Sequence, residues 1–230
     1  MTVHPARRTL RAAEVPAQGL AVLAGVLAAA GIAVHRTGRR SGATDAEATM
    51  TLPGDGIVSR PTLVCDRVTT YAASPEEVWP WIVQLGKDRA GWYLPSPVAS
   101  LVPRRRQGAW VVRPHLQRLV VGEVVPDWGP MPFTVHAVAP YRHIVYSADR
   151  GAGDDPGSSR PLALSWALVL RPAGPGTRLH LRLRMRGTAR FPAAVQALGG
   201  FVDYLTIALL FAGLRQRLRT ASGEDQSADQ

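Results

Sequence analysis

The clearest alternation of hydrophobic and polar residues lies between Leu179 and Arg186. Leucine and methionine occupy every second position, and histidine and arginine occupy the positions between them. A period of two predicts a β-strand with one packed face and one face in water. Residues rich in valine, threonine, tyrosine and leucine predict further strands at 63–72, 133–139, 143–148 and 162–170, and weaker patterns suggest strands at 110–112 and 120–125.

Two segments have the period of an α-helix instead. Ser74 followed by Pro75 and Glu77 is typical of a capped helix start, and Gly86 suits its end. Apolar residues at helical spacing predict a long helix over 193–219. The order is strand, helix, irregular stretch, antiparallel strands, long helix. This order predicts an α+β fold in which a curved antiparallel sheet surrounds the C-terminal helix.

The N-terminal part of the chain carries a run of 20 uncharged residues at 15–34, flanked by arginines on both sides. About 20 such residues are needed to cross a bilayer. We therefore expect a single-pass membrane anchor at 15–35. A cleaved secretory signal and a soluble or surface-lying helix are the alternatives. A second span at 191–214 is also considered, although Asp203 and two adjacent glycines disfavour it.

The composition divides the rest of the chain. Residues 1–14 form a basic N-terminus, and residues 36–60 lack apolar periodicity, which indicates a linker. Residues 61–219 are long enough to form one domain with a sizeable core. The polar, acidic residues 220–230 predict a disordered tail.

Charge and cysteine content restrict the classes of function. The chain has 230 residues, 27 Lys and Arg against 17 Asp and Glu, and a formal net charge of +10. One cysteine, Cys65, excludes an internal disulfide framework and a cysteine-based zinc cluster. The basic surface suits anionic lipid headgroups, for which the arginines at 36–40, 104–106 and 182–186 are candidates, or it is simply solvated. No nucleic-acid-binding module is recognised, so we expect no nucleic-acid partner.

Several stretches resemble the opening and strands of the SRPBCC (START/Bet v 1-like, polyketide cyclase-like) superfamily, and are nearest to its actinobacterial-type members. The most specific is ASPEEVWPWIVQLG at 73–86, followed by RAGWY at 89–93. VGEVVP at 121–126, FTV at 133–135, SWALVL at 165–170 and TRL at 177–179 support it. Two departures are a proline-rich stretch after Tyr93 and an unusually apolar last helix.

The resemblance implies a helix-grip fold with a hydrophobic cavity between sheet and helix. Ligand pockets are mostly apolar and aromatic with a few polar groups. The residues expected to line this cavity are Trp92, Tyr93, Trp110, Phe133, Tyr146, Trp166, Asp203 and Tyr204. For each aromatic residue, packing in the core is the alternative. Asp203 is either a cavity acid or a salt-bridged residue on the outside of the helix.

No motif for catalysis, nucleotide binding or metal binding is present, and none of the six histidines has a metal-ligand spacing. We therefore assign no catalytic residue, no metal and no cofactor. The leading hypothesis is a membrane-anchored domain that binds a hydrophobic small molecule or lipid. The alternatives are a cyclase- or dehydratase-like enzyme acting in the same cavity and a membrane-associated structural protein. The lone cysteine and the basic domain slightly favour the cytoplasmic side.

Overall fold

The structure is a computed structural model that describes residues 25, 38–126, 131–151, 161–187 and 193–228. The expected anchor at 15–35 lies outside these residues except for Gly25, so the apolar N-terminal helix is not confirmed. Within the described part of the chain, which includes residues 193–214, no helix combines the length and the hydrophobicity needed to cross a membrane.

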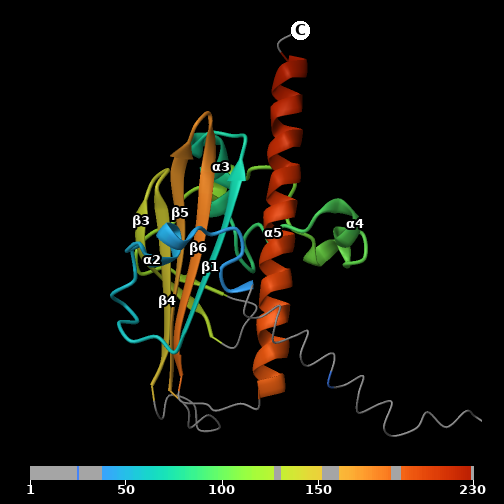
Figure 1. Cartoon of the computed structure of the whole chain (residues 1–230). Coiled ribbons are helices and arrows are strands. Elements are labelled where there is room, and N and C mark those ends of the chain that lie inside the picture. Colours follow the sequence, from blue (N-terminus) through green and yellow to red (C-terminus); the bar gives the residue numbers. More distant parts are fainter. Residues whose placement is uncertain (1–24, 26–37, 127–130, 152–160, 188–192, 229–230) are drawn as a thin grey trace, which may run out of the picture.

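The described residues form an α+β fold, with six antiparallel strands and a long C-terminal helix α5 that runs beside the sheet (Figure 1). The strand order is β1-β6-β5-β4-β3-β2, which is consistent with the expected helix-grip arrangement. The strands are β1 Leu63–Tyr71, β2 Val124–Val125, β3 Phe133–Ala139, β4 His143–Arg150, β5 Leu162–Ala173 and β6 Gly176–Gly187. The helices are α2 Asp45–Thr49, α3 Pro75–Val83, α4 Ser96–Ala99 and α5 Ala193–Ala228, with 3₁₀ turns η1 Arg104–Arg106 and η2 Pro114–Leu116.

Local sequence signals place most of these elements correctly. Ser74 caps α3 as predicted, because its backbone N–H donates to Glu77 Oε2 at 2.6 Å and its hydroxyl accepts from the Glu77 N–H at 3.3 Å. Residues 110–112 do not form a strand, and only Val124–Val125 of the 120–125 stretch pairs in the sheet. Helix α5 extends through residues 220–228, which the sequence assigned to a tail.

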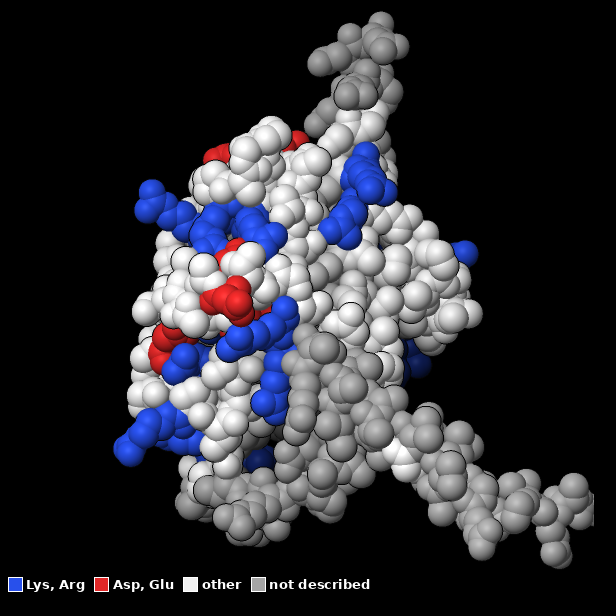
Figure 2. Space-filling model, in the orientation of Figure 1, with Lys and Arg blue, Asp and Glu red and all other residues white. Residues whose placement is uncertain are grey.

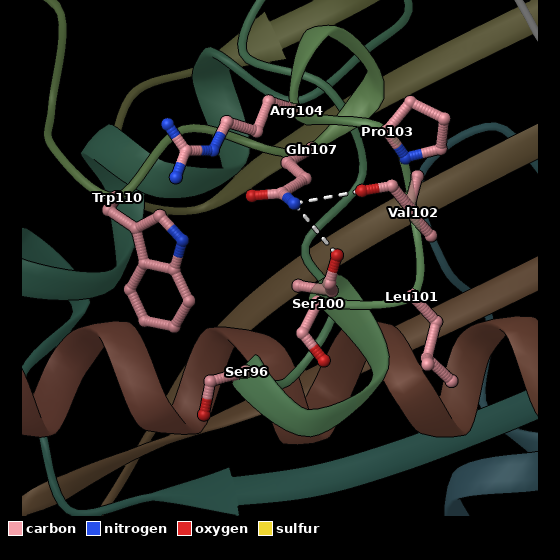
Figure 3. A pocket seen from close by; sticks show the side chains of 9 residues that line it. Ser96, Ser100, Leu101, Val102, Pro103, Arg104, Gln107 and Trp110 are labelled. Atoms are coloured by element: carbon pink, nitrogen blue, oxygen red, sulfur yellow. Dashed lines mark hydrogen bonds between the residues drawn. The ribbon is translucent and has the colours of Figure 1, made fainter.

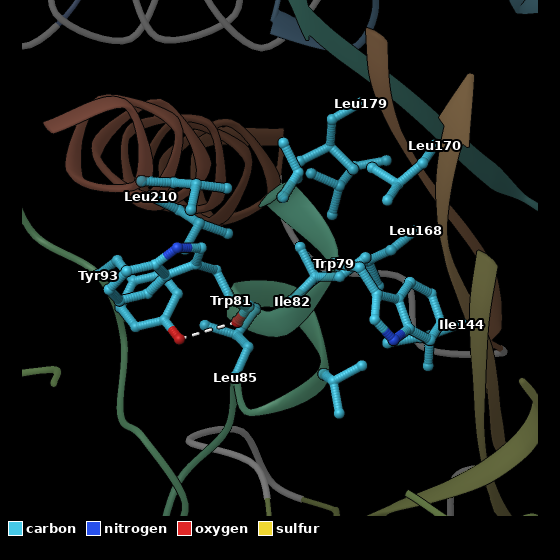
Figure 4. Close-up of a cluster of buried hydrophobic side chains, with 14 of the residues drawn as sticks. Trp79, Trp81, Ile82, Leu85, Tyr93, Ile144, Leu168, Leu170, Leu179 and Leu210 are labelled. Atoms are coloured by element: carbon cyan, nitrogen blue, oxygen red, sulfur yellow. Dashed lines mark hydrogen bonds between the residues drawn. The ribbon is translucent and has the colours of Figure 1, made fainter. Parts of the chain in front are cut away.

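The inner face of the sheet packs against α3 and α5. Alternate residues of β5 and β6, such as Leu168, Leu170, Leu179 and Leu181, are buried in this core. Figure 4 shows Leu168, Leu170 and Leu179 of the sheet on the side of α3, whose Trp79 and Ile82 side chains point toward them. The period-two pattern of β6 therefore identified the packed face correctly.

The opposite, outer face of the sheet is covered by residues 38–60, which we call the strap. The sequence indicated a linker here. Instead, the strap carries α2 and buries Leu52 and Val58. Its first residues also run along the free edge of the sheet, where the Asp66 and Val68 N–H groups donate to the carbonyls of Arg39 and Ser41 at 2.5 and 2.9 Å. Pairing of this kind covers an otherwise exposed strand edge.

The strap explains why the middle of the polar face of β6, at His180 and Arg182, is buried, whereas Arg186 further along is exposed. Arg182 is only 3% exposed and donates to Asp66 Oδ1 at 2.6 Å, to Asp55 Oδ2 at 2.9 Å and to three carbonyls of the strap. His180, fully buried, contacts the same Asp66 carboxylate at 2.7 Å. Figure 2 shows the resulting mixture of basic and acidic side chains around α2. The assignment of Arg182 to a lipid-facing or solvated surface is therefore wrong.

Candidate functional site

Four of the eight predicted site residues converge on the inner face of the sheet. Trp166 is at the centre, with ring centroids 5.8 Å from Tyr146, 6.1 Å from Phe133 and 6.2 Å from Trp92. Phe133 and Tyr146 also contact each other, at 6.0 Å. We call Trp92, Phe133, Tyr146 and Trp166 the aromatic cluster. Such separations are typical of favourable aromatic pairs.

The sheet and one loop position these rings. Tyr146 of β4 pairs directly with Trp166 of β5, so the two side chains project from the same face. Phe133 projects beside them at the start of β3. Trp92 comes from the loop after α3, where Gly91 adopts a positive φ of 80° that a residue with a side chain rarely adopts. The Trp92 indole N–H then donates to the Thr206 carbonyl of α5 at 3.1 Å.

This placement of Trp92 changes the expected cavity. Its ring bridges α5 and β5, so it occupies part of the space between helix and sheet that was expected to be hollow. A further ring between Trp92 and Trp166 would require about 7 Å, twice the carbon–carbon contact distance. The observed 6.2 Å leaves no such room. A ligand would therefore contact the edges and outer faces of the cluster, where Trp92, Phe133 and Trp166 are only partly buried.

An ion pair lies near the aromatic cluster. The Arg89 Nη1 donates to Glu123 Oε1 at 2.8 Å, and its Nη2 donates to the carbonyl of Leu116 at 2.9 Å. Burial raises the pKa of the Tyr146 phenol, with Arg89 lowering it and Glu123 raising it to lesser extents. Tyr146 is therefore protonated at neutral pH and can donate a hydrogen bond, but it cannot serve as a base.

Two other predicted site residues, Tyr93 and Trp110, belong to a different contact. The Arg217 guanidinium of α5 lies 4.6 Å from the Tyr93 ring centroid and 4.1 Å from that of Trp110. Tyr93 is fully buried, and its hydroxyl donates to the Trp81 carbonyl at 2.8 Å. Neither ring therefore contributes to the aromatic cluster.

Arg217 itself was not predicted as an important residue. It donates to the carbonyls of Ala109, Gly108, Leu94 and Gly213 at 2.6–3.1 Å, and burial lowers its pKa to about 10. It therefore remains charged at pH 7 and holds the loop after Trp92 on α5.

The last two predicted residues, Asp203 and Tyr204, lie on α5 near β1 and the strap. Asp203 forms an ion pair with the buried Arg67 of β1 at 2.5 Å, so it is salt-bridged, but toward the sheet and not on the outside of the helix. A Cβ at Gly38 would lie 2.9 Å from the Tyr204 ring, which shows that Tyr204 packs against the start of the strap.

Sequence reasoning also missed Arg89 and Glu123, although both stand in the stretches RAGWY and VGEVVP that carry the family resemblance. Their pairing across 34 positions gives no local signal. No group of three or more His, Cys, Asp or Glu side chains in the described residues could hold a metal ion.

Comparison with solved structures gives matches of low sequence identity, including the three below. No protein-family model and no curated protein matches the chain. Protein MLL2253 from Mesorhizobium loti is 21% identical, with 67% of this chain and 97% of that chain covered and a TM-score of 0.36. DynU16, from the dynemicin biosynthetic locus, is 16% identical over 70% of this chain and 49% of its own, with a TM-score of 0.40. CalU16 from Micromonospora echinospora is 17% identical over 72% and 86%, with a TM-score of 0.36.

Proposed function

We propose that this chain is a membrane-anchored, SRPBCC-like binding protein whose aromatic cluster holds a hydrophobic small molecule or lipid. One observation carries the binding function, namely that four rings from three strands and a loop meet around Trp166. Partly buried rings of this kind offer apolar contact area for a ligand. The anchor at 15–34 is proposed from the sequence alone, and with it a location at the membrane, with the domain on the cytoplasmic side.

Polar groups near the cluster suit binding better than catalysis. An acid–base reaction needs a proton acceptor aimed at the ligand. Burial keeps the Tyr146 phenol protonated, and the Glu123 carboxylate is paired with Arg89. Tyr146 can therefore orient a ligand carbonyl by donating a hydrogen bond. A cyclase- or dehydratase-like enzyme at the same cluster is the second candidate, because a protonated phenol could also act as an acid.

The test of binding is the ligand content of the purified full-length chain. An organic extract analysed by mass spectrometry is expected to contain an apolar compound in stoichiometric amount. The Trp166→Leu variant removes the central ring of the cluster and should retain less than about a tenth of the compound. The loss of the apolar contact between one ring and the ligand costs about 1.5 kcal/mol or more, which is roughly tenfold in affinity.

The matched control is Tyr141→Ala. Tyr141 is an exposed aromatic residue that contacts Trp79 and lies outside the cluster. This variant should keep the compound. Melting curves by circular dichroism exclude loss through unfolding. Equal ligand loss in both variants, or no compound in the parent chain together with no stabilisation by added apolar probes, would contradict the proposal and favour a structural role.

A further inference from the structure

The surface opposite the strap, built by residues 96–113, combines exposed apolar side chains with positive charge. Leu101 is 84% exposed, Val111 63%, and Trp110 37%. Arg104–Arg106 form the 3₁₀ turn η1, and none of these three arginines is buried. We call residues 96–113 the arginine loop. A soluble surface seldom exposes a cluster of large apolar residues without a binding role.

The charge of this region has one sign. Residues 96–113 contain four arginines and neither Asp nor Glu. On the face seen in Figure 2, the lobe around α4 shows no acidic side chain. This differs from the outer face of the sheet, where Arg178, Arg182 and Arg184 of β6 are paired with the strap carboxylates of Glu47 and Asp55. The positive charge of the arginine loop is therefore not compensated by carboxylates within the loop, in contrast to that of the paired β6 arginines.

The loop is held in a fixed shape on α5. Gln216 of α5 bonds to both the backbone N–H and the hydroxyl of Ser96, each at 2.8 Å. Gln107 donates to the carbonyls of Ala99 and Val102, both at 2.9 Å, and so braces the turn that carries Leu101. Arg217 fixes the other end through Gly108 and Ala109. The exposed position of Leu101 is thus a property of a braced turn.

Within the loop lies a hollow of about 750 Å³ (Figure 3). Its lining combines a cation, two hydroxyls, an amide and apolar carbon, from Ser96, Ser100, Leu101, Arg104, Gln107 and Trp110. A guanidinium and hydroxyls are ordinary ligands of phosphate oxygens, and an indole ring suits the boundary between headgroups and acyl chains.

From these observations we propose that the arginine loop docks on a bilayer surface carrying anionic phospholipids, with Leu101 and Trp110 entering the interface and Arg104–Arg106 meeting headgroup phosphates. The occupant is a lipid surface rather than a protein because exposed apolar side chains and three consecutive arginines stand beside a hollow lined by a guanidinium and hydroxyls. This inference deepens the membrane part of the proposed function. It does not depend on a ligand at the aromatic cluster.

The test places a fluorophore at the tip of the loop. Cys65, the one native cysteine, is buried and burial raises its pKa to about 11, so it resists labelling. Leu101→Cys in the full chain is labelled with an environment-sensitive dye and mixed with phosphatidylcholine vesicles, with or without phosphatidylglycerol. We expect a blue shift in emission with the anionic vesicles only, which high salt abolishes.

The matched control is Ala46→Cys, labelled in the same way on the exposed surface of α2 at the opposite side of the molecule. It should show no shift, even if residues 15–34 insert in the vesicle. Replacing Arg104, Arg105 and Arg106 by Gln in the Leu101→Cys chain should raise the anionic lipid concentration for half the shift about 100-fold, since each arginine contributes independently.

Three results would overturn the proposal. They are no shift at position 101 with any vesicle, an equal shift at position 46, or a shift that survives the triple Gln replacement. The absence of any shift at position 101 would indicate that the surface binds an acidic protein partner instead of a bilayer. None of them bears on extraction of a ligand from the aromatic cluster, so failure of docking and failure of small-molecule binding are separate results.

Discussion

Among single residues, Glu47 of the strap forms ion pairs with two arginines of the sheet. Its carboxylate accepts from Arg178 Nε at 2.6 Å and from Arg171 Nη2 at 2.8 Å. It also accepts from the Thr44 backbone N–H at 2.9 Å, which completes the capping box of α2. Hydrogen bonding to Arg178 is the largest cause that lowers the Glu47 pKa from 4.5 to about 2. Glu47 therefore couples the strap to β5 and β6.

The consequence is a stability that depends on pH. Because the pKa is lower in the folded state, Glu47 stabilises the fold above pH 4.5, and this contribution is lost as the pH falls toward 2. We predict that Glu47→Gln lowers the free energy of unfolding by about 2 kcal/mol at pH 7. Urea denaturation should show the difference shrinking between pH 4.5 and 2. Glu76→Gln, at an exposed position on α3, is the control and should change little. A pH-independent loss at Glu47 would contradict this account.

At the scale of elements, the contact between α5 and the loop after Trp92 depends on one glycine. A Cβ at Gly213 would lie 2.3 Å from the Tyr93 carbonyl oxygen and 2.8 Å from the Leu94 carbonyl carbon. Because both contacts are with backbone, the neighbour cannot give way by rotating a side chain. The absence of a side chain at 213 thus lets Arg217, one turn later, reach the Leu94 carbonyl.

Gly213→Ala should therefore separate the loop from the helix. We predict a loss of about 2–3 kcal/mol in the free energy of unfolding, measured by denaturant titration, which is typical of overpacking. Gly223→Ala in the same helix is the matched control, since a Cβ there meets nothing within 4 Å. It should leave stability unchanged or raise it by up to about 1 kcal/mol through helix propensity. Equal stability of the two variants would show that the close approach at Gly213 is not energetically important.

Considered as a whole, the molecule shows which structural elements can be predicted from short stretches of its sequence. The alternation in β6 and the cap at Ser74 predicted their elements because both signals lie within a few residues. The strap was missed because its own sequence has no periodicity and its contacts are remote. Arg182, for example, bonds to the Glu47 carbonyl across 135 positions. Thr44 followed by Glu47 was the available local sign of a capped helix.

The candidate site divides in the same way. Tyr146 and Trp166 were correctly grouped because strand alternation puts them on one face, where their register makes them neighbours. Trp110 and Asp203 instead lie away from the cluster, because their partners, Arg217 and Arg67, come from distant parts of the chain. Sequence patterns show which way a strand residue faces, but pairing between loops and helices is fixed only when the elements pack.

The strap also determines how the proposed anchor must be tested. Deleting residues 1–37 removes the apolar segment and leaves the strap intact, because the described contacts begin with Gly38 packing against Tyr204. We predict that this deletion moves the protein from the membrane fraction to the soluble fraction after a high-salt wash, with an unchanged melting temperature. The wash is needed because screening weakens any attraction between the arginine loop and anionic lipid.

Deleting residues 1–60 is the informative comparison. It also removes the side chain of Leu52 from Val145 and Val169, and it removes the Asp55 carboxylate and three carbonyls from Arg182. Leaving a buried guanidinium without these partners is expected to cost about 3–5 kcal/mol, a large part of the stability of a domain. The longer deletion should therefore aggregate or lose its cooperative melting transition. If the 1–37 deletion stays with the membrane after the wash, residues 15–34 are not the anchor. If the 1–60 deletion melts like the parent chain, the strap is not part of the folding unit.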